Sequence, residues 1–397
     1  MFREFDLSED TSSQRLGTRF LVFPQPRFIP GYEKPEPVWI STPRGRVGGG
    51  PSDHRLYVVD PLRPKEPYSA PYLPPFIGDV FPPAEPGPDG HFDELLPGTR
   101  QFLAAHAFAS VRRVLDICES YMGQEVSWFF SDSYKRLEII PLLDWDNSHS
   151  GYGFLELGED SSRQEPYPFA LNFDAIAHET GHLLLLGAIG VPRHSRLSVD
   201  FLAYHEAAAD FISLLGLLHF DTALDHILRR TRGNLLISNE LDRLAELSDE
   251  KQVRTLSHSL RIGDVGDEAH DRSRPFSGAL FDTLVEIFQL ILVERGLASL
   301  DTRTIREVRL DLRQEELDRE AVQLREAYNA SHFALKSALE EARDLVGEMF
   351  VGSWFYLDPD NFSFPMASEA LVQAVSNRRG KRFTDRVYLN FAWRGLL

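Results

Sequence analysis

The most informative stretch of this chain is Ala175-Ile-Ala-His-Glu-Thr-Gly-His-Leu-Leu-Leu-Leu-Gly187. It contains His178 and His182, and residues four apart on a helix point the same way. Both imidazoles can therefore bind one zinc ion. Glu179 lies at the edge of the same face, close enough to take a proton from a zinc-activated water without binding the metal itself.

The residues around this motif favour a metal site. The alternative is an amphipathic helix with two polar residues on its solvated face. Ala175–Ala177 and Leu183–Leu186 make the helix apolar nearly all round, so we expect it to be buried. Two histidines and a glutamate inside a buried helix need partners. A zinc ion supplies them.

A third zinc ligand is expected on the next helix, from about Val199 to Phe220. A catalytic zinc usually has three protein ligands and one open position. Glu206 and Asp210 share a face of this helix, so we predict that Glu206 binds zinc and that Asp210 accepts a hydrogen bond from a ligand histidine. His205 is a rival ligand, but it points about 100° away from Glu206. The alternative is an alanine-rich helix with incidental acids.

Such a site would hydrolyse an amide bond. Zinc lowers the pKa of its bound water and polarises a carbonyl, while Glu179 acts as the general base. The tetrahedral oxyanion needs a further hydrogen-bond donor. The residues alone leave five histidines open for this role: His219, His226, His258, His270 and His332.

The composition indicates a soluble globular protein of two domains, or one domain with an appendage. Of its 397 residues, 43% are hydrophobic and 26% are charged. A net charge of −18 disfavours nucleic acid and anionic membranes as partners. No apolar run approaches a membrane span and the N-terminus lacks a signal-peptide core, so we expect a cytoplasmic protein. Cys118 is the single cysteine, which excludes a disulfide framework. We expect a small buried side chain there rather than a zinc-blocking thiol.

Residues 1–98 are expected to form an extended, proline-rich arm that packs on the main body. Eighteen of the 25 prolines fall between Pro24 and Pro97, which disfavours long regular elements. Short strands are predicted at Arg19–Phe23 and Arg55–Asp60. Stretches near 44–53 and 82–90 are expected to be mobile.

Two lobes are predicted to follow the arm, one over residues 99–190 and one over 191–397. In the first, a helix over Thr99–Met122 capped by Gly123 precedes three strands and the motif helix, which starts near Asn172. The strands are expected at Glu125–Phe130, Arg136–Ile140 and Gly153–Leu157, the last half-buried. The second lobe is expected to be mainly helical, with helices after Val199–Phe220 at 221–230, 238–260, 276–295, 303–349 and 366–376, and a closing strand at 381–393.

The chain resembles the thermolysin-like zinc metallopeptidases over roughly residues 100–295. Asp174–His182 is similar to that family's D-x-x-x-H-E-x-x-H helix, and His205–Asp210 to its N-E-x-x-S-D helix. His270–Phe281 resembles its H-x-N-S-G segment. The resemblance implies an α+β zincin with a sheet-and-helix N-terminal lobe and a mainly helical C-terminal lobe. It also implies that His270 stabilises the oxyanion.

The same resemblance implies further roles and shows two departures. Asp174 would support the metal site from the start of the motif helix, and Asn147 and Ser148 sit where the family's edge strand aligns the substrate backbone. Leu197 stands where the family has a catalytic tyrosine. The acidic cluster of the family's calcium sites is not recognisable after Asp210, so we expect no calcium.

The leading hypothesis is a cytoplasmic zinc endopeptidase that acts on a peptide or protein, with neither nucleic acid nor membrane as partner. One alternative is an inactive zincin that binds a peptide or protein without cutting it. Another is an autoinhibited enzyme with residues 20–98 across the cleft. An aminopeptidase is disfavoured by the lack of a G-x-M-E-N-like motif, and a membrane prenyl-protein peptidase by the lack of a transmembrane segment in the sequence.

Overall fold

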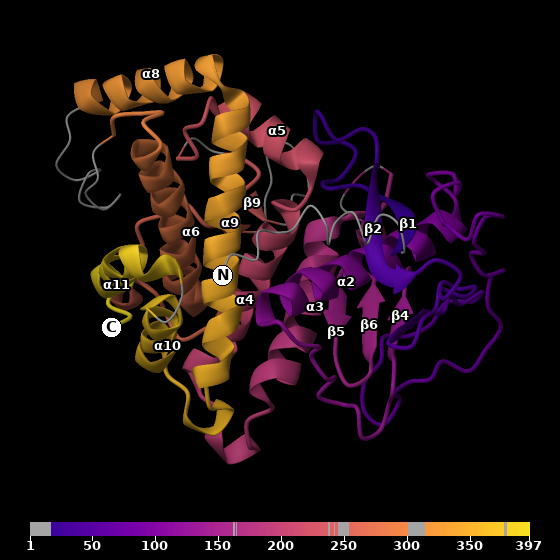
Figure 1. Ribbon diagram of the computed structural model, residues 1–397. Coiled ribbons are helices and arrows are strands. Elements are labelled where there is room, and N and C mark those ends of the chain that lie inside the picture. Colours follow the sequence, from indigo (N-terminus) through magenta and orange to yellow (C-terminus); the bar gives the residue numbers. More distant parts are fainter. Residues whose placement is uncertain are drawn as a thin grey trace. The chain divides into compact units, whose positions relative to one another are not determined.

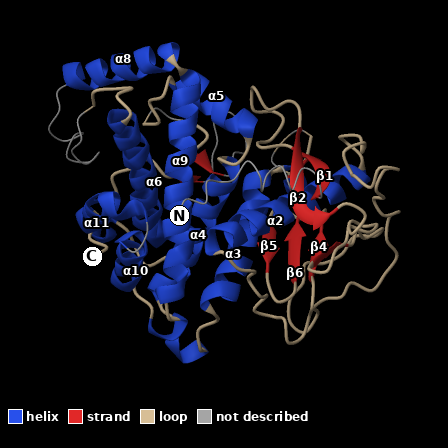
Figure 2. Cartoon of the chain, in the orientation of Figure 1, coloured by secondary structure: helices blue, strands red, loops and turns tan. Residues whose placement is uncertain are grey.

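The computed structural model describes residues 17–161, 163, 165–236, 239–241, 243–244, 254–300, 314–376 and 379–397. The chain forms two compact units, one of Met1–Glu119, Val126–Leu184 and Glu246–Lys251, the other of Ser120–Glu125, Leu185–Ala245 and Gln252–Leu397. Most described strands belong to the first unit, and the second is mainly helical (Figure 2). The expected α+β class is confirmed. The division at residues 99 and 191 stays a prediction.

A four-stranded sheet forms the centre of the first unit. Its order is β3 (Leu56–Val58), β4 (Leu137–Ile140), β6 (Phe154–Leu157) and β5 (Ser148–Ser150). The first three strands run parallel, and β5 pairs antiparallel with β6 at the edge of the sheet (Figure 1). The strands expected at 55–60, 136–140 and 153–157 are thus confirmed. All four residues of β6 are buried, however, and not every second one as expected.

The arm contributes two further strands, which pair antiparallel with each other: β1 (Gly17–Val22) and β2 (Glu36–Pro43). The first was predicted. The second was missed because Pro37 and Pro43 argue against a regular element. Both prolines stand near the ends of β2, where a missing ladder donor costs little.

Helix α2 (Arg100–Met122) confirms the predicted helix and anchors the arm. The ring centroids of Phe20 and Phe108 lie 5.8 Å apart, and the Phe23 N–H donates to Nε2 of the buried His106 at 2.9 Å. Gly123 ends the helix with a φ of 75°, which favours glycine. Cys118 is buried on α2 as expected, and burial raises the pKa of its thiol.

Acid is expected to destabilise the protein through His106. Burial lowers the pKa of this imidazole to about 3, from 6.5 in an unfolded chain. The unfolded state alone binds a proton between these values, so stability falls as the pH drops from 6.5 towards 3. Well below pH 6.5 each pH unit costs about 1.4 kcal/mol, and the total between pH 6.5 and 4.5 is roughly 2.3 kcal/mol. His106→Gln keeps an acceptor for Phe23 and does not titrate, so urea midpoints should show a shallower acid loss than wild type. Parallel pH curves would contradict this.

The strand expected at Glu125–Phe130 is wrong, because other groups take up its backbone hydrogen bonds. The Val126 N–H donates to Glu119, and the Val126 carbonyl accepts from the Arg55 guanidinium. The Phe130 carbonyl accepts from two residues of the following turn, Ser133 and Tyr134. A ladder partner would have to displace all of these bonds.

Two carboxylates buried in the sheet bind the arm to it. Glu138 on β4 accepts hydrogen bonds from the hydroxyls of Tyr57 and Tyr68, at 2.7 and 2.6 Å. Glu156 on β6 forms an ion pair with the buried Lys65 and accepts from the Tyr68 N–H at 2.7 Å. Both glutamates have no exposed surface. The arm is therefore an integral part of the sheet's core.

The two arm stretches expected to be mobile are bonded to each other. The Gly50 N–H donates to the Ala84 carbonyl at 2.9 Å, and Val47 and Ala84 are buried. This contact joins the two ends of the proline-rich segment that runs from Gly50 to Ala84.

The second unit is built around helix α6 (Ala269–Glu294), which begins seven residues earlier than expected. It packs against α4 (Val199–Leu217), α9 (His332–Ser353) and α11 (Thr384–Trp393) (Figure 1). By length and composition α6 could cross a membrane, contrary to the expectation from the sequence. Its apolar window is 83% buried inside the protein, as in the core helix of a globular domain.

Helices α4, α5 (Asp221–Thr231) and α10 (Phe364–Ser376) confirm three predicted helices. Two other predicted helices differ from the structure. In place of the single helix expected over 303–349, the described residues form two helices, α8 (Gln314–Ala330) and α9. Ser331 separates them, and its hydroxyl caps α9. Residues 301–313 lie outside the described chain. The helix expected over 238–260 is wrong where the chain is described. There, β9 (Arg243–Leu244) pairs with β10 (Arg254–Thr255). The Asn239 side chain accepts from the Leu241 N–H, a local bond that competes with helix formation.

The closing strand expected at 381–393 is wrong as well, since residues 384–393 form α11. Its buried residues are Val387, Asn390 and Phe391, three and four apart, which is helical spacing. The sequence alternates polar and apolar residues over part of this stretch, and that alternation suggested a strand. Packing against α6 and α10 selects the helix.

Candidate metal site

Helix α3 (Phe173–Ile189) carries the H-E-x-x-H motif, as expected. Buried side chains on either side of the motif hold the helix in the core, among them Ile176, Ala177 and Leu183–Leu185. His178 and His182 remain half-buried, and their Nε2 atoms lie 3.1 Å apart. The four-residue spacing therefore brings the two rings together as predicted.

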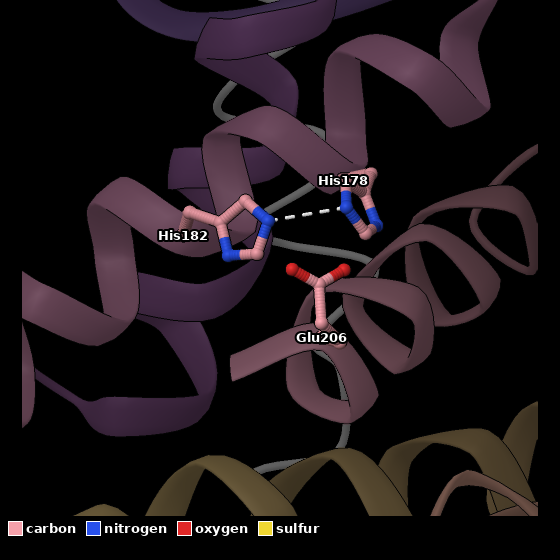
Figure 3. A group of neighbouring side chains, drawn as sticks. All are labelled: His178, His182 and Glu206. Carbon is pink, nitrogen blue, oxygen red and sulfur yellow. Dashed lines mark hydrogen bonds between the residues drawn. The ribbon is translucent and has the colours of Figure 1, made fainter. Parts of the chain in front are cut away.

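The carboxylate of Glu206 on α4 completes a group of three. One atom from each of His178, His182 and Glu206 lies within 4.8 Å of the other two. Figure 3 shows the two rings and the carboxylate facing one another. Among the described residues, the group contains Glu206 and not its rival His205. The His205 ring is 8% exposed and packs 4.8 Å from that of Phe201.

The donor set fits zinc. Two imidazole nitrogens on one tetrahedral zinc ion, each at about 2.05 Å, lie about 3.3 Å apart, close to the separation found here. Two histidines and a carboxylate are also a ligand set of hydrolytic zinc. All three residues are only partly buried.

Glu179 is held beside the two histidines by a residue that the sequence analysis missed. The Ser150 hydroxyl lies 2.9 Å from Glu179 Oε2 and 3.0 Å from the Glu179 carbonyl oxygen. Glu179 itself is 9% exposed. Ser150 could have been considered from the sequence, because it stands two residues after Ser148 on an expected strand and so shares its face.

His270 lies in the first turn of α6, with its ring exposed. Its Nε2 is 3.2 Å from Glu206 Oε2, and its Nδ1 is 2.9 Å from Glu268 Oε1. The hydrogen bond from the His270 ring lowers the pKa of Glu268 to about 2. Glu268, the N-cap of α6, was also missed. In the sequence, Glu268 could have been identified by its position, two residues before a candidate catalytic histidine.

The structure separates His270 from the other histidines that were left open as oxyanion donors. His270 contacts the Glu206 carboxylate. The other four contact different groups: His219 the Tyr121 hydroxyl at 2.9 Å, His226 the Glu240 carboxylate at 3.2 Å, His258 the Arg394 guanidinium at 3.4 Å, and His332 the Phe333 ring at 4.0 Å.

Two predicted supporting acids lie buried on the helices that carry His178, His182 and Glu206. Asp210 is one turn beyond Glu206 on α4 and is 1% exposed. Asp174, in the first turn of α3, accepts a hydrogen bond from the arm residue Gln25 at 2.9 Å. Their support of the metal site stays a prediction.

The two residues expected to align substrate lie at the edge of the sheet. Ser148 is the first residue of β5. Asn147 precedes it, with its side-chain oxygen accepting from the Ser148 N–H at 2.9 Å. Gly158 is required here, since a Cβ on it would lie 1.8 Å from the Trp145 carbonyl oxygen and 2.5 Å from that of Asn147. Substrate alignment stays a prediction.

Tyr204 does not take the place of Leu197 in the described part of the chain. Leu197 is 43% exposed, just before α4. Tyr204, the nearest tyrosine in sequence, is fully buried against the rings of Phe276 and Phe362. Burial raises the pKa of its hydroxyl. Tyr204 is thus a core residue.

Comparison with known proteins shows a likeness in fold to a solved structure. No family model matches the sequence, and no curated protein matches it either. Among solved structures, the fold is similar to the precursor of protealysin, a metalloproteinase from Serratia proteamaculans. The TM-score is 0.49 and the identity 11%, over 86% of this chain and 87% of that one.

Proposed function

We propose that this protein is a zinc-dependent metalloendopeptidase whose substrate is a peptide or protein. One observation carries the proposal: His178, His182 and Glu206 bring three zinc-ligand atoms within 4.8 Å of one another. Glu179, the residue between them that can act as a base, is held in place by Ser150. A purely structural zinc site would have no use for such a base.

In the proposed reaction, each residue of the site would have a separate role. A zinc ion held by the three ligands would supply a Lewis acid and an acidified water. Glu179 takes the proton of the attacking water and passes it to the leaving amine. His270 donates a hydrogen bond from Nε2 to the oxyanion, while Glu268 orients the ring through Nδ1. Peptide bonds fit this arrangement because their hydrolysis needs a base, an oxyanion donor and a leaving-group acid.

Metal removal tests the proposal. We expect one zinc ion per purified chain, loss of cleavage of a quenched-fluorescence peptide library after chelation, and recovery on adding zinc. Glu206→Gln should weaken zinc binding by more than about 100-fold, because it removes a charged ligand. Glu94→Gln, an exposed glutamate of the arm, serves as the matched control. Full cleavage by metal-free protein would refute the proposal.

A binding module without catalysis is the second candidate. The exposed Leu197, at the position where the resembled family has its catalytic tyrosine, is the observation that favours it. Zinc in the purified protein, together with no cleavage of any library peptide, would support this alternative.

A further inference from the structure

We infer that Ser150 is a positioning residue that fixes the carboxylate of Glu179 for proton transfer. The inference rests on the proposed function. It assigns a role to a residue at the edge of the sheet that neither the motif nor the resemblance marks. Its basis is one hydroxyl that touches two oxygens of the same glutamate, at 2.9 Å for Oε2 and 3.0 Å for the backbone carbonyl.

The position of Ser150 is set by the sheet. It is the last residue of β5 and lies opposite Leu155 of β6 in the antiparallel register. The next residue, Gly151, donates its N–H to the Phe154 carbonyl at 2.9 Å and so closes the hairpin. A hydroxyl on such an anchored backbone is a fixed donor for a side chain on the neighbouring helix.

The helix alone does not fix the Glu179 carboxylate. Helix α3 places the Cα, but a glutamate side chain has three further torsions and loses that freedom only through contacts. Ser150 has a single hydroxyl proton to share between its two acceptors. A bond to Oε2 holds the carboxylate by that oxygen. Proton transfer depends steeply on such placement.

The first test is kinetic. Ser150→Ala should lower kcat by about 10- to 100-fold on a quenched peptide and leave KM within about twofold, because placement of the base acts on the chemical step. Ser150→Thr restores the hydroxyl and should recover most of kcat. Ser133→Ala is the control, since it removes an exposed serine hydroxyl of the same unit, bonded to the Tyr152 hydroxyl. A raised KM with unchanged kcat would overturn the inference and leave Ser150 as a residue that merely shapes β5.

The second test needs neither metal nor activity. Urea unfolding midpoints of the metal-free protein are measured for wild type, Ser150→Ala, Glu179→Ala and the double variant, because alanine removes the acceptor of the Ser150 hydroxyl. Coupling through the carboxylate predicts that the double variant loses less than the sum of the single losses. Additive losses would overturn the inference. A crystal structure of Ser150→Ala should show the Glu179 carboxylate displaced, and an unmoved carboxylate would also count against it.

The two tests separate this inference from the function on which it rests. If wild type cleaves nothing while the midpoints show coupling, the proposed function fails and the Ser150–Glu179 contact stands without a catalytic role. If wild type cleaves and the midpoints are additive, the peptidase stands and the positioning role of Ser150 fails.

Discussion

Glu179→Gln is expected to lower kcat/KM for peptide cleavage by about 10³-fold and to leave the bound zinc in place. General-base catalysis contributes roughly 10²- to 10⁴-fold, and glutamine keeps the shape of the side chain but removes its basicity. The proposed zinc ligands His178, His182 and Glu206 are untouched by the change. Metal analysis and cleavage of the peptide library, run side by side on both proteins, give the result.

Glu179→Asp is the informative companion of this variant. It retains a carboxylate but shortens the side chain by one methylene, which withdraws it from the site and from Ser150. We expect intermediate activity with full zinc content. Activity of Glu179→Gln equal to wild type would exclude Glu179 as the base, and loss of zinc from either variant would show that Glu179 supports the metal itself.

Removing the arm, residues 1–98, is expected to abolish folding and not to activate the protein. The deletion takes away β3, the partner of β4, and exposes the apolar face that β1 covers on α2. It also leaves Glu138 and Glu156 buried without Tyr57, Lys65 and Tyr68. Circular dichroism and solubility of the truncated chain provide the measurement.

A single substitution tests the structural role of the arm without removing it. Lys65→Met takes the buried ammonium away from the Glu156 carboxylate, which keeps its contact with the His149 ring at 2.6 Å. We expect a cost of about 3 kcal/mol, the lower end of the range for a broken buried pair, because His149 remains. Lys34→Met, at an exposed position of the same arm, should change stability by less than about 0.5 kcal/mol. The autoinhibition alternative makes the opposite prediction, a soluble truncated protein with raised activity, and that outcome would contradict the structural role of the arm.

Much of the candidate site could be predicted from local spacing. The four-residue repeat in α3 brings His178 and His182 together, and helical phase correctly placed Glu206, and not His205, in the group. Both arguments need only the geometry of a single helix. Three strands of the sheet, β3, β4 and β6, were also predicted from local patterns, short runs of mainly apolar residues such as Leu137–Ile140. The polar strand β5 was expected only from the family resemblance.

What was missed depends on contacts between segments distant in sequence. Ser150 contacts Glu179, which lies 29 residues later in the chain. The pairing of β5 with β6 holds Ser150 in the position where its hydroxyl makes this contact. Residues 384–393 form a helix because Val387 and Phe391 find their partners in the second unit, although the local pattern suggests a strand. Glu156 was expected on a half-exposed face, and Lys65, far earlier in the chain, allows its burial.

The parallel pairing of β3 with β4 has a consequence for biosynthesis. Leu56 faces Leu137 in the register, 81 residues later in the chain. At about 5–20 residues per second, a ribosome needs roughly 4–16 s to make that interval. During this time the nascent arm presents strand edges and apolar side chains whose partners do not yet exist. β3 therefore completes its parallel pairing only after β4 has been synthesised.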